Sequence, residues 1–374
     1  RILGAGEGLE GQAFTQARDA EAGRIESEGC AGDPKVRCQV VSLYRGGQFK
    51  LYKFRRYTDV RLAFAPEDRA ATFGGDLDNF SFPRFAIDAA FIRLYEDGKP
   101  VETPVPFTGN ADRPTEGEPV FVSGNPGATQ RLLTQAQLAT VRDVVLPMDQ
   151  LIASELRGRL IRFSEESEEN AFIAMDPIVG LENTYKRGRG RQAALIDAAF
   201  TGRLAEAEAD FRRRVAADPA LAARGDPWAA LEAVQPIQRE LYPAYALLEG
   251  RAGGGSSLYG AAGRLPAVEQ RILAERPVYP ALEQVQLEWW LSKTREWLTV
   301  DDPRVRGLLG QESPEALSAR LIEGSTLGDP AVRRALWEGG LPAIQASTDP
   351  LIQHVLRTDP AARAVRAEWE EKVQ

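Results

Sequence analysis

Histidine is nearly absent from this sequence: the 374 residues contain one, His354. A Ser-His-Asp triad needs a histidine as its base. His354 lies in a segment predicted to be helical, far from the predicted strands, so we interpret it as a surface or packing residue. The sequence also has no Gly-x-Ser-x-Gly or Gly-Asp-Ser-Gly-like turn that would carry a nucleophilic serine. We therefore expect the chain by itself to lack a complete Ser-His-Asp triad.

Cysteine is also scarce, and the two cysteines are Cys30 and Cys38. Neither a Cys-x-x-Cys nor a Cys/His pair occurs, so we predict no zinc or other metal site. The short loop between the cysteines contains glycine and proline, and an oxidising compartment would permit a disulfide that closes it. Two unpaired thiols in a reducing compartment fit the spacing equally well, so both alternatives stay open.

Long apolar runs and excess positive charge are missing as well. No apolar run approaches the roughly 20 residues of a membrane span. The net charge is −8, from 46 basic and 54 acidic residues, so we expect no nucleic-acid partner. Gly188 and Gly190 give a partial Gly-x-Gly-x-x-Ala, but a dinucleotide fingerprint needs a strand before it. The preceding segment is predicted to be helical, so we interpret residues 186–191 as a basic loop.

The two ends of the chain lack the usual signals. The sequence begins with Arg1 rather than Met and shows no signal-peptide pattern. Near the other end, Val365, Trp369 and Val373 recur at i, i+4 and i+8 with no glycine or proline to end the helix. We expect both ends to be internal points of a longer protein.

Residues 1–145 are predicted to be mainly β. Two β-branched and aromatic runs are joined by Arg45-Gly46-Gly47, which indicates a hairpin. Short strands at this spacing favour an antiparallel barrel or sandwich. The predicted strands are residues 36–44, 48–54, 60–65, 88–95 and 119–123.

Residues 146–374 are predicted to be all-α. Leu156, Leu160 and Phe163 share one helical face, and residues 282, 285 and 289 continue the helical character. Glycine and proline clusters, such as residues 253–255, interrupt the pattern without dividing it. A longer stripe at spacings of three and four is formed by Ile196, Phe200, Leu204, Ala207, Phe211 and Val215.

The segment with the most unusual composition is 74–88, with the sequence Gly-Gly-Asp-Leu-Asp-Asn-Phe-Ser-Phe-Pro-Arg-Phe-Ala-Ile-Asp. A calcium loop is excluded, because Phe80 stands where the third oxygen ligand should be. In a structural interpretation, Asp76 and Asp78 cap the backbone while Phe80 and Phe82 fill a core. In a functional one, the same groups form a site, and composition alone favours neither.

This segment resembles the bacterial dipeptidyl-peptidase family that contains types seven and eleven. The shared pattern is Gly-Gly-Asp-x-Asp-Asn-aromatic-x-aromatic-Pro-Arg, followed four residues later by an aspartate. The resemblance implies an α+β multidomain chain, in which part of a chymotrypsin-like antiparallel β-barrel (1–145) precedes an α-helical inserted domain (146–374). It implies serine-type chemistry without a metal or organic cofactor. Further segments that resemble the family are residues 37–44, 57–66, 124–131 and 180–186.

The resemblance implies roles for four residues. Asp88 matches the triad aspartate, which accepts the second N–H of the catalytic histidine and fixes its tautomer. Asn79 and Asn183 match residues that bind the free α-amino group of the substrate. Phe80 stands where many relatives have tryptophan and would line the pocket for the first substrate residue without an indole N–H.

The resemblance also accounts for what is absent. It implies that the catalytic histidine precedes Arg1 and that the serine, in a Gly-Asn-Ser-Gly turn, follows Gln374, so the isolated chain would be inactive. The determinant of acidic or hydrophobic preference would lie downstream too. The implied partners are peptides with a free N-terminus and a second copy of the chain. The implied location is the periplasm or cell surface, which favours a Cys30–Cys38 disulfide. The alternative is a catalytically inactive relative that only binds peptide N-termini.

Overall fold

The computed structural model describes residues 1–9, 11–72, 83–103, 112, 114–121, 132–264 and 277–373. The chain divides into two compact units, Arg1–Arg131 and Leu132–Gln374. Within the described ranges, every helix is too short or too polar to cross a membrane.

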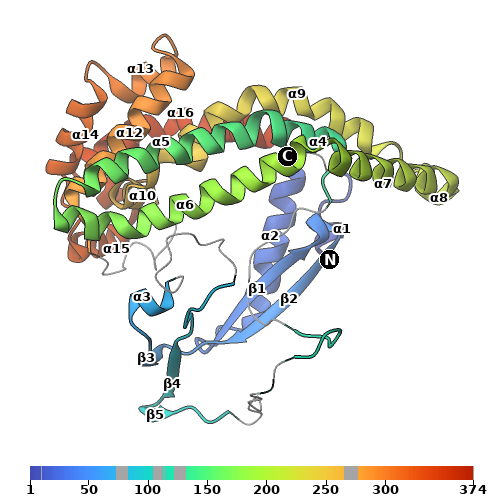
Figure 1. The fold of residues 1–374 in the computed structure, drawn as a ribbon, viewed down its shortest axis with the longest axis horizontal. Helices are drawn as coiled ribbons and strands as arrows, with labels where there is room; N and C mark the ends of the chain where they lie inside the picture. Colours follow the sequence, from blue (N-terminus) through green and yellow to red (C-terminus); the bar gives the residue numbers. More distant parts are fainter. Residues whose placement is uncertain are drawn as a thin grey trace. The chain divides into compact units, whose positions relative to one another are not determined.

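The first unit begins with two helices and a hairpin. After the short α1 (Ile2–Ala5), α2 (Gly11–Cys30) runs for 20 residues and packs along β1 (Val36–Leu43) (Figure 1). The sequence patterns did not predict α2, because its apolar residues are few and irregular. Its alanine, glutamate, glutamine and arginine residues have high intrinsic helix propensity.

The predicted hairpin is present, with small differences at its ends. β1 pairs antiparallel with β2 (Gln48–Arg55), and the 3₁₀ turn η1 (Tyr44–Gly46) joins them. The register places Val36 opposite Arg55 and Leu43 opposite Gln48. β-branched and aromatic residues on both strands favour this extended pairing.

A second sheet has the order β3-β4-β5, all antiparallel. Its strands are β3 (Asp59–Phe64), β4 (Phe91–Glu96) and β5 (Lys99–Pro100), and the short helix α3 (Asp68–Ala71) follows β3. Asp97 and Gly98 join β4 to β5 with φ values of 52° and 74°. Positive φ at both central residues is the requirement of a type I′ turn, which Asp-Gly satisfies well.

Two strand predictions need correction, and the predicted barrel is not seen as such. In the described residues the strands form one two-stranded and one three-stranded sheet, and these do not close into a barrel. β4 begins at Phe91 rather than at residue 88, because the pairing with β3 ends at the Phe64–Phe91 pair. Residues 119–121, the described part of the fifth predicted strand, are irregular and pair with no described strand.

The helical unit begins earlier than residue 146. Thr134 forms a capping box with Gln137 at the start of α4 (Gln135–Thr140). Such a box satisfies two backbone N–H groups that the first helical turn would leave unpaired. The helix continues through a π-helical turn, η3 (Val141–Val145), into α5 (Leu146–Ser164). The expected boundary at 145 therefore falls inside a continuous helix.

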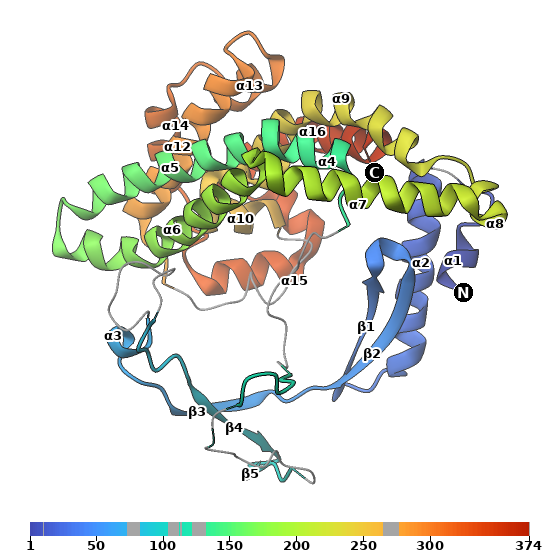
Figure 2. The same cartoon turned by 45° about the vertical axis from the view of Figure 1, so that its right-hand side comes forward.

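Helices α5 and α6 (Glu168–Ile196) lie side by side in both views (Figures 1 and 2). α6 passes without interruption through residues 186–191, so the predicted basic loop is wrong. A glycine inside a helix costs only about 1 kcal/mol relative to alanine, so Gly188 and Gly190 do not break a helix of 29 residues. The absence of a preceding strand agrees with the exclusion of a dinucleotide fingerprint.

Most of the remaining helices of this unit begin in the same way. Seven of those described, α8, α9 and α12 to α16, have proline in the first turn, and all but α12 have an Asp or Ser side chain as N-cap. Proline suits this position because its missing N–H would be unpaired there anyway. The elements are α7 (Ala198–Ala217), α8 (Pro219–Ala222), α9 (Pro227–Tyr245), η4 (Ala246–Gly250), η5 (Ala252–Gly255), α10 (Ser257–Arg264), α12 (Pro280–Leu298), α13 (Pro303–Leu309), α14 (Pro314–Glu323), α15 (Pro330–Ala346) and α16 (Pro350–Lys372).

The core of this unit surrounds α12, whose Trp289 and Trp290 are almost completely buried. The predicted face of Leu156, Leu160 and Phe163 is buried as well, as its spacing indicated. The longer stripe of residues 196–215 behaves differently. Asp197 caps α7 and separates it from residue 196 at the end of α6, and α7 has no buried residue. An amphipathic period therefore identified this helix correctly but overestimated its burial.

A glycine turn brings η5 close to α12. Gly254 has φ of 63°, and a Cβ atom there would lie 2.6 Å from the carbonyl oxygen of Gln286. Only glycine therefore fits this position. Beside the turn, the buried carboxylate of Glu283 accepts hydrogen bonds from the Ser256 hydroxyl at 2.5 Å and the Leu258 N–H at 3.1 Å. These bonds satisfy the start of α10 from a neighbouring helix.

Candidate functional site

Asp88 lies in the irregular segment that leads into β4, and its side chain is exposed. The segment is fixed one residue earlier, where the Ile87 N–H donates a hydrogen bond to the Ala70 carbonyl oxygen at 2.9 Å. This bond ties the segment to the end of α3. The position gives a carboxylate that a partner can reach, on a backbone held by a neighbouring element. The sequence predicts Asp88 as the first residue of the strand, whereas the structure places it three residues before β4.

Two of the other predicted site residues, Asn79 and Phe80, lie outside the described residues. The same holds for Asp76, Asp78 and the predicted turn at 124–131. Their proposed roles therefore remain predictions from the sequence.

Asn183 is exposed on α6, in the second unit. Beside it, the Arg157 guanidinium of α5 forms an ion pair with Glu182, and the Lys186 ammonium lies 3.6 Å from the same carboxylate. The Thr184 hydroxyl donates to the Gly180 carbonyl oxygen at 2.9 Å. These contacts fix the turn of α6 that carries Asn183. The sequence contained one signal for them, the glutamate and lysine four residues apart, which are neighbours on a helix.

His354 is buried on α16, with 4% of its surface exposed. Its Nδ1 accepts a hydrogen bond from the Arg357 guanidinium at 3.1 Å, so the proton of the neutral ring is on Nε2. Burial, together with the nearby charges of Arg357 and Arg320, lowers the pKa of His354 to about 4. Because the ring is buried and its one lone pair, on Nδ1, already accepts a hydrogen bond from Arg357, His354 is not placed to take a proton from a nucleophile. Of the two interpretations from the sequence, packing is correct and surface exposure is not.

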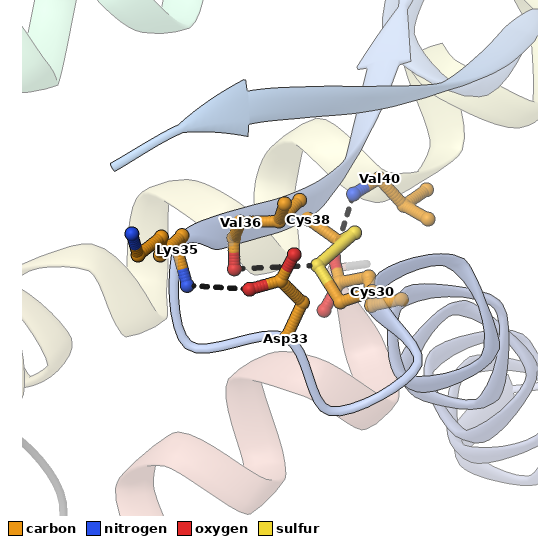
Figure 3. The surroundings of a disulfide bond; sticks show 7 residues. Cys30, Asp33, Lys35, Val36, Cys38 and Val40 are labelled. Atoms are coloured by element: carbon orange, nitrogen blue, oxygen red, sulfur yellow. Dashed lines mark hydrogen bonds between the residues drawn. A yellow bond between two sulfur atoms is a disulfide. The ribbon is translucent and has the colours of Figure 1, made fainter. Parts of the chain in front are cut away.

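Cys30 and Cys38 form a disulfide, with their Cα atoms 5.7 Å apart (Figure 3). The bond joins the last residue of α2 to β1, and between the cysteines the Lys35 N–H donates to the Asp33 carboxylate at 2.8 Å. A further link comes from the Val40 N–H, which donates to the Glu26 carboxylate of α2 at 2.6 Å. Of the two alternatives that the spacing left open, the structure contains the disulfide.

Acidic, histidine and cysteine side chains do not gather into a metal site in the part of the chain that the structure describes. Chemically, the described candidate residues therefore offer an accessible carboxylate at Asp88 and an amide on α6. The sequence places no histidine in the first unit, and His354 of the second unit is buried.

Comparison with known proteins gives a consistent result. A family model described as Peptidase S46 matches residues 1–374. The Asp/Glu-specific dipeptidyl-peptidase of Shewanella putrefaciens is 27% identical over 87% of this chain and 49% of its own length. Dipeptidyl-peptidase 7 of Phocaeicola vulgatus is 30% identical over 52% of this chain and 28% of its own length. The chain thus spans at most about half the length of these relatives.

The solved structures show the same fold at lower identity. The crystal structure of Porphyromonas endodontalis DPP11 in complex with the dipeptide Arg-Asp covers 95% of this chain, with a TM-score of 0.65 and 17% identity. The complex of the same protein with Arg-Glu covers 96%, with a TM-score of 0.64 and 17% identity. In each case the matched part is 55% or 56% of the DPP11 chain. Because the family model matches the whole sequence, the chain belongs to the peptidase S46 family.

Proposed function

We propose that this chain is part of a serine-type dipeptidyl-peptidase, which removes dipeptides from the free N-terminus of peptides through an acyl-enzyme. The observation that carries the proposal is the family match over all 374 residues, to a family whose matching relatives are named dipeptidyl-peptidases. The histidine and the serine of the triad come from outside the chain. Consistent with this, its single histidine is buried and neutral.

Asp88 is the residue that we assign to the triad. An aspartate in this role accepts the Nδ1–H of the histidine, holds the tautomer that can receive the serine proton, and stabilises the imidazolium that forms. The exposed side chain and the anchored backbone at Ile87 suit this role. No metal or organic cofactor is needed for this chemistry.

Asn79, Phe80 and Asn183 are the residues that we assign to the substrate. Two amide oxygens can accept hydrogen bonds from an α-ammonium group, and a site closed behind that group would admit only two residues before the cut bond. Phe80 would supply an apolar wall for the first residue. Since Asn183 stands on α6, a helix fixed by the Arg157–Glu182 ion pair, its amide has a rigid support.

The exposed face of the second sheet supports the idea that further chain completes a chymotrypsin-like barrel. Alternate residues of a strand share one face, and on β3 the exposed fractions of Val60 and Leu62 are 49% and 70%. Opposite Leu62, Ile92 of β4 is 62% exposed. Apolar side chains gathered in this way usually have a partner surface. We propose the missing part of the parent protein as that partner.

The disulfide supports a location in the periplasm or at the cell surface, because disulfides persist in oxidising compartments. We also propose that the parent protein is a homodimer. Light scattering on the purified parent would measure the mass directly, and a monomer at micromolar concentration would contradict this part of the proposal.

The catalytic proposal is tested on the full parent protein with Asp88→Asn. An asparagine at this place favours the wrong histidine tautomer, so kcat should fall by about 10⁴-fold while the substrate still binds. Asp97→Asn is the matched control, because it removes a carboxylate from a turn of the same unit at a φ that asparagine tolerates. The measurement is dipeptide release from a fluorogenic dipeptidyl amide. A loss below tenfold for Asp88→Asn would overturn the assignment.

The amine anchor is tested with Asn183→Ala and Asn79→Ala on the same substrate. Each should reduce kcat/KM, and an N-acetylated substrate should not be cleaved by any form. Asn170→Ala, on the first turn of α6, controls for effects on that helix. Saturable peptide binding without turnover by the parent would instead support the inactive relative as the correct function.

A further inference from the structure

The helical unit contains a pocket of about 290 Å³ that the proposed peptidase function does not use. All of its lining residues belong to the second unit, on α10, α12, α13, α16 and the turn η4 with the residues after it. A cavity of 150 Å³ can hold benzene. By that scale this pocket has room for a ligand of roughly a dozen non-hydrogen atoms.

Glycines on two helices keep the pocket open. Gly260 and Gly263 lie three residues apart on α10, and Gly307 lies on α13. None has a positive φ, and a Cβ atom on any of them would meet no other atom within 4 Å. Neither backbone conformation nor close packing therefore requires glycine, although glycine is unfavourable inside a helix. A side chain at any of these positions would occupy the space that a ligand needs.

The floor of the pocket is apolar and aromatic. Trp290 is 1% exposed, Leu308 is 3% exposed and Tyr259 is 8% exposed, with the two aromatic ring centroids 4.9 Å apart. The indole N–H of Trp290 donates to the Leu247 carbonyl oxygen at 2.7 Å, so its polar group is already satisfied. The floor is therefore formed by two aromatic rings and a leucine side chain, which favour an apolar or aromatic body.

The charged groups at the rim are paired with one exception. Arg366 forms an ion pair with Glu249. Two further lining residues pair with residues outside the lining. Arg304 pairs with Asp302 at 2.6 Å, and Asp359 pairs with Arg363 at 2.5 Å.

Arg357 is the exception. Within the described ranges, no carboxylate oxygen lies within 4 Å of its guanidinium nitrogens, and its hydrogen-bond partner is the neutral ring of His354. This bond uses one N–H group and orients the side chain. The pocket thus has one arginine without a direct ion pair; Glu312, which interacts with it electrostatically, is not among the lining residues.

We propose that this pocket binds a small organic monocarboxylate, with its carboxylate on Arg357 and its apolar body over Trp290 and Tyr259. A guanidinium matches a carboxylate in charge and in its paired N–H geometry. A phosphate dianion fits less well, because Glu249 and Asp359 stand on the same rim. The proposal does not depend on the peptidase function.

The test is calorimetric titration of the 374-residue chain with hippurate, an aromatic carboxylate of suitable size. Its neutral amide, hippuramide, is the matched ligand. We expect saturable binding of hippurate and at least tenfold weaker binding of hippuramide. Equal affinities for hippurate and hippuramide would show that Arg357 does not bind the carboxylate. The absence of binding by hippurate, benzoate, phenylacetate and indole-3-acetate alike would overturn the proposal.

Three variants locate the binding. Arg357→Gln should weaken hippurate at least tenfold, whereas Arg334→Gln, an exposed arginine of α15 outside the lining, should not. Gly260→Ala should keep or raise the Tm, because alanine is the better helix former, and should still weaken binding at least threefold. Equal effects of the two arginine variants, or full affinity in Gly260→Ala, would place the ligand elsewhere and contradict the proposal.

Discussion

His354 shows how its surroundings determine what a single side chain can do. The ring accepts one hydrogen bond at Nδ1, and Nε2 has no hydrogen-bond partner among the residues that the structure describes. Protonation would add a charge in a buried place, beside the positive charges of Arg357 and Arg320. The neutral form is therefore favoured in the folded protein, although a histidine in an unfolded chain has a pKa near 6.5.

This difference predicts a pH dependence with a definite sign. Because the folded-state pKa is about 4 and the unfolded value is 6.5, the unfolded state binds more protons between these values. Stability should be fully present above pH 6.5 and should fall as the pH drops, with a loss of about 2 kcal/mol by pH 5. Urea unfolding followed by tryptophan fluorescence measures it, because all six tryptophans lie in the second unit.

His354→Leu is the comparison for this prediction. Without a titrating ring, the free energy of unfolding should change little between pH 8 and pH 5, since the chain has no other histidine. Carboxylates with lowered pKa, such as Glu312 beside Arg320, act mainly below this window. An equal loss in both proteins would show that another group causes it.

At the same scale, the sequence motif identified the candidate residues but not their surroundings. Asp88 and Asn183 were assigned from the pattern around them, and both are exposed. The burial of His354 could not be predicted, because it depends on packing between α16 and Tyr259 of α10, about a hundred residues earlier in the chain. Arg357 was not singled out, since an arginine on a helix is usually solvated.

Among the elements, the Cys30–Cys38 disulfide joins a helix and a strand that differ in how well the sequence predicts them. The hairpin of β1 and β2 was predicted nearly to the residue, because alternating β-branched and aromatic residues flank a glycine turn. α2 was missed, because it has little apolar periodicity and forms from propensity and packing on β1. The continuous α6 was interrupted in the prediction by glycines that packing against α5 tolerates.

Removing the disulfide should weaken the first unit specifically. Closing a loop with this separation of 8 residues lowers the entropy of the unfolded chain, which stabilises the folded state by about 2.5 kcal/mol in the chain-entropy model. In Cys30→Ser/Cys38→Ser we therefore expect faster amide hydrogen exchange in α2, β1 and β2, measured by mass spectrometry.

The helical unit is the internal control for this experiment, and its exchange and tryptophan emission should not change. If α2 and the hairpin kept their protection from exchange in the double variant, other contacts would be holding α2 against β1. The Glu26–Val40 hydrogen bond, which also links α2 to β1, would be the first of these to examine.

Over the whole molecule, the apolar core is divided very unequally. Among the buried apolar side chains of the described residues, Ile2 alone belongs to the first unit, and all others belong to the second. Hydrophobic burial is the main source of folding free energy. The second unit therefore has its own source of stability, whereas the first has a small sheet, a hairpin and a disulfide.

We expect limited trypsin digestion to remove the first unit before the second. Residues 1–131 should give small peptides by mass spectrometry, while far-UV circular dichroism and tryptophan emission of the helical unit persist. The comparison protein is the full parent, in which the proposed missing chain would cover the exposed sheet and slow the cleavage. Simultaneous loss of both units would show that they depend on one another for stability.

The prolines that begin seven of the described helices also affect how the chain regains its structure. In an unfolded chain each X–Pro bond is cis in roughly 10–30% of molecules. With seven such bonds at a cis fraction near 20%, only about one unfolded molecule in five has all of them trans. The others must wait for isomerisation, which takes tens of seconds, although helices with local contacts form far faster. The prolines that begin these helices in the folded state therefore make refolding slow for most molecules.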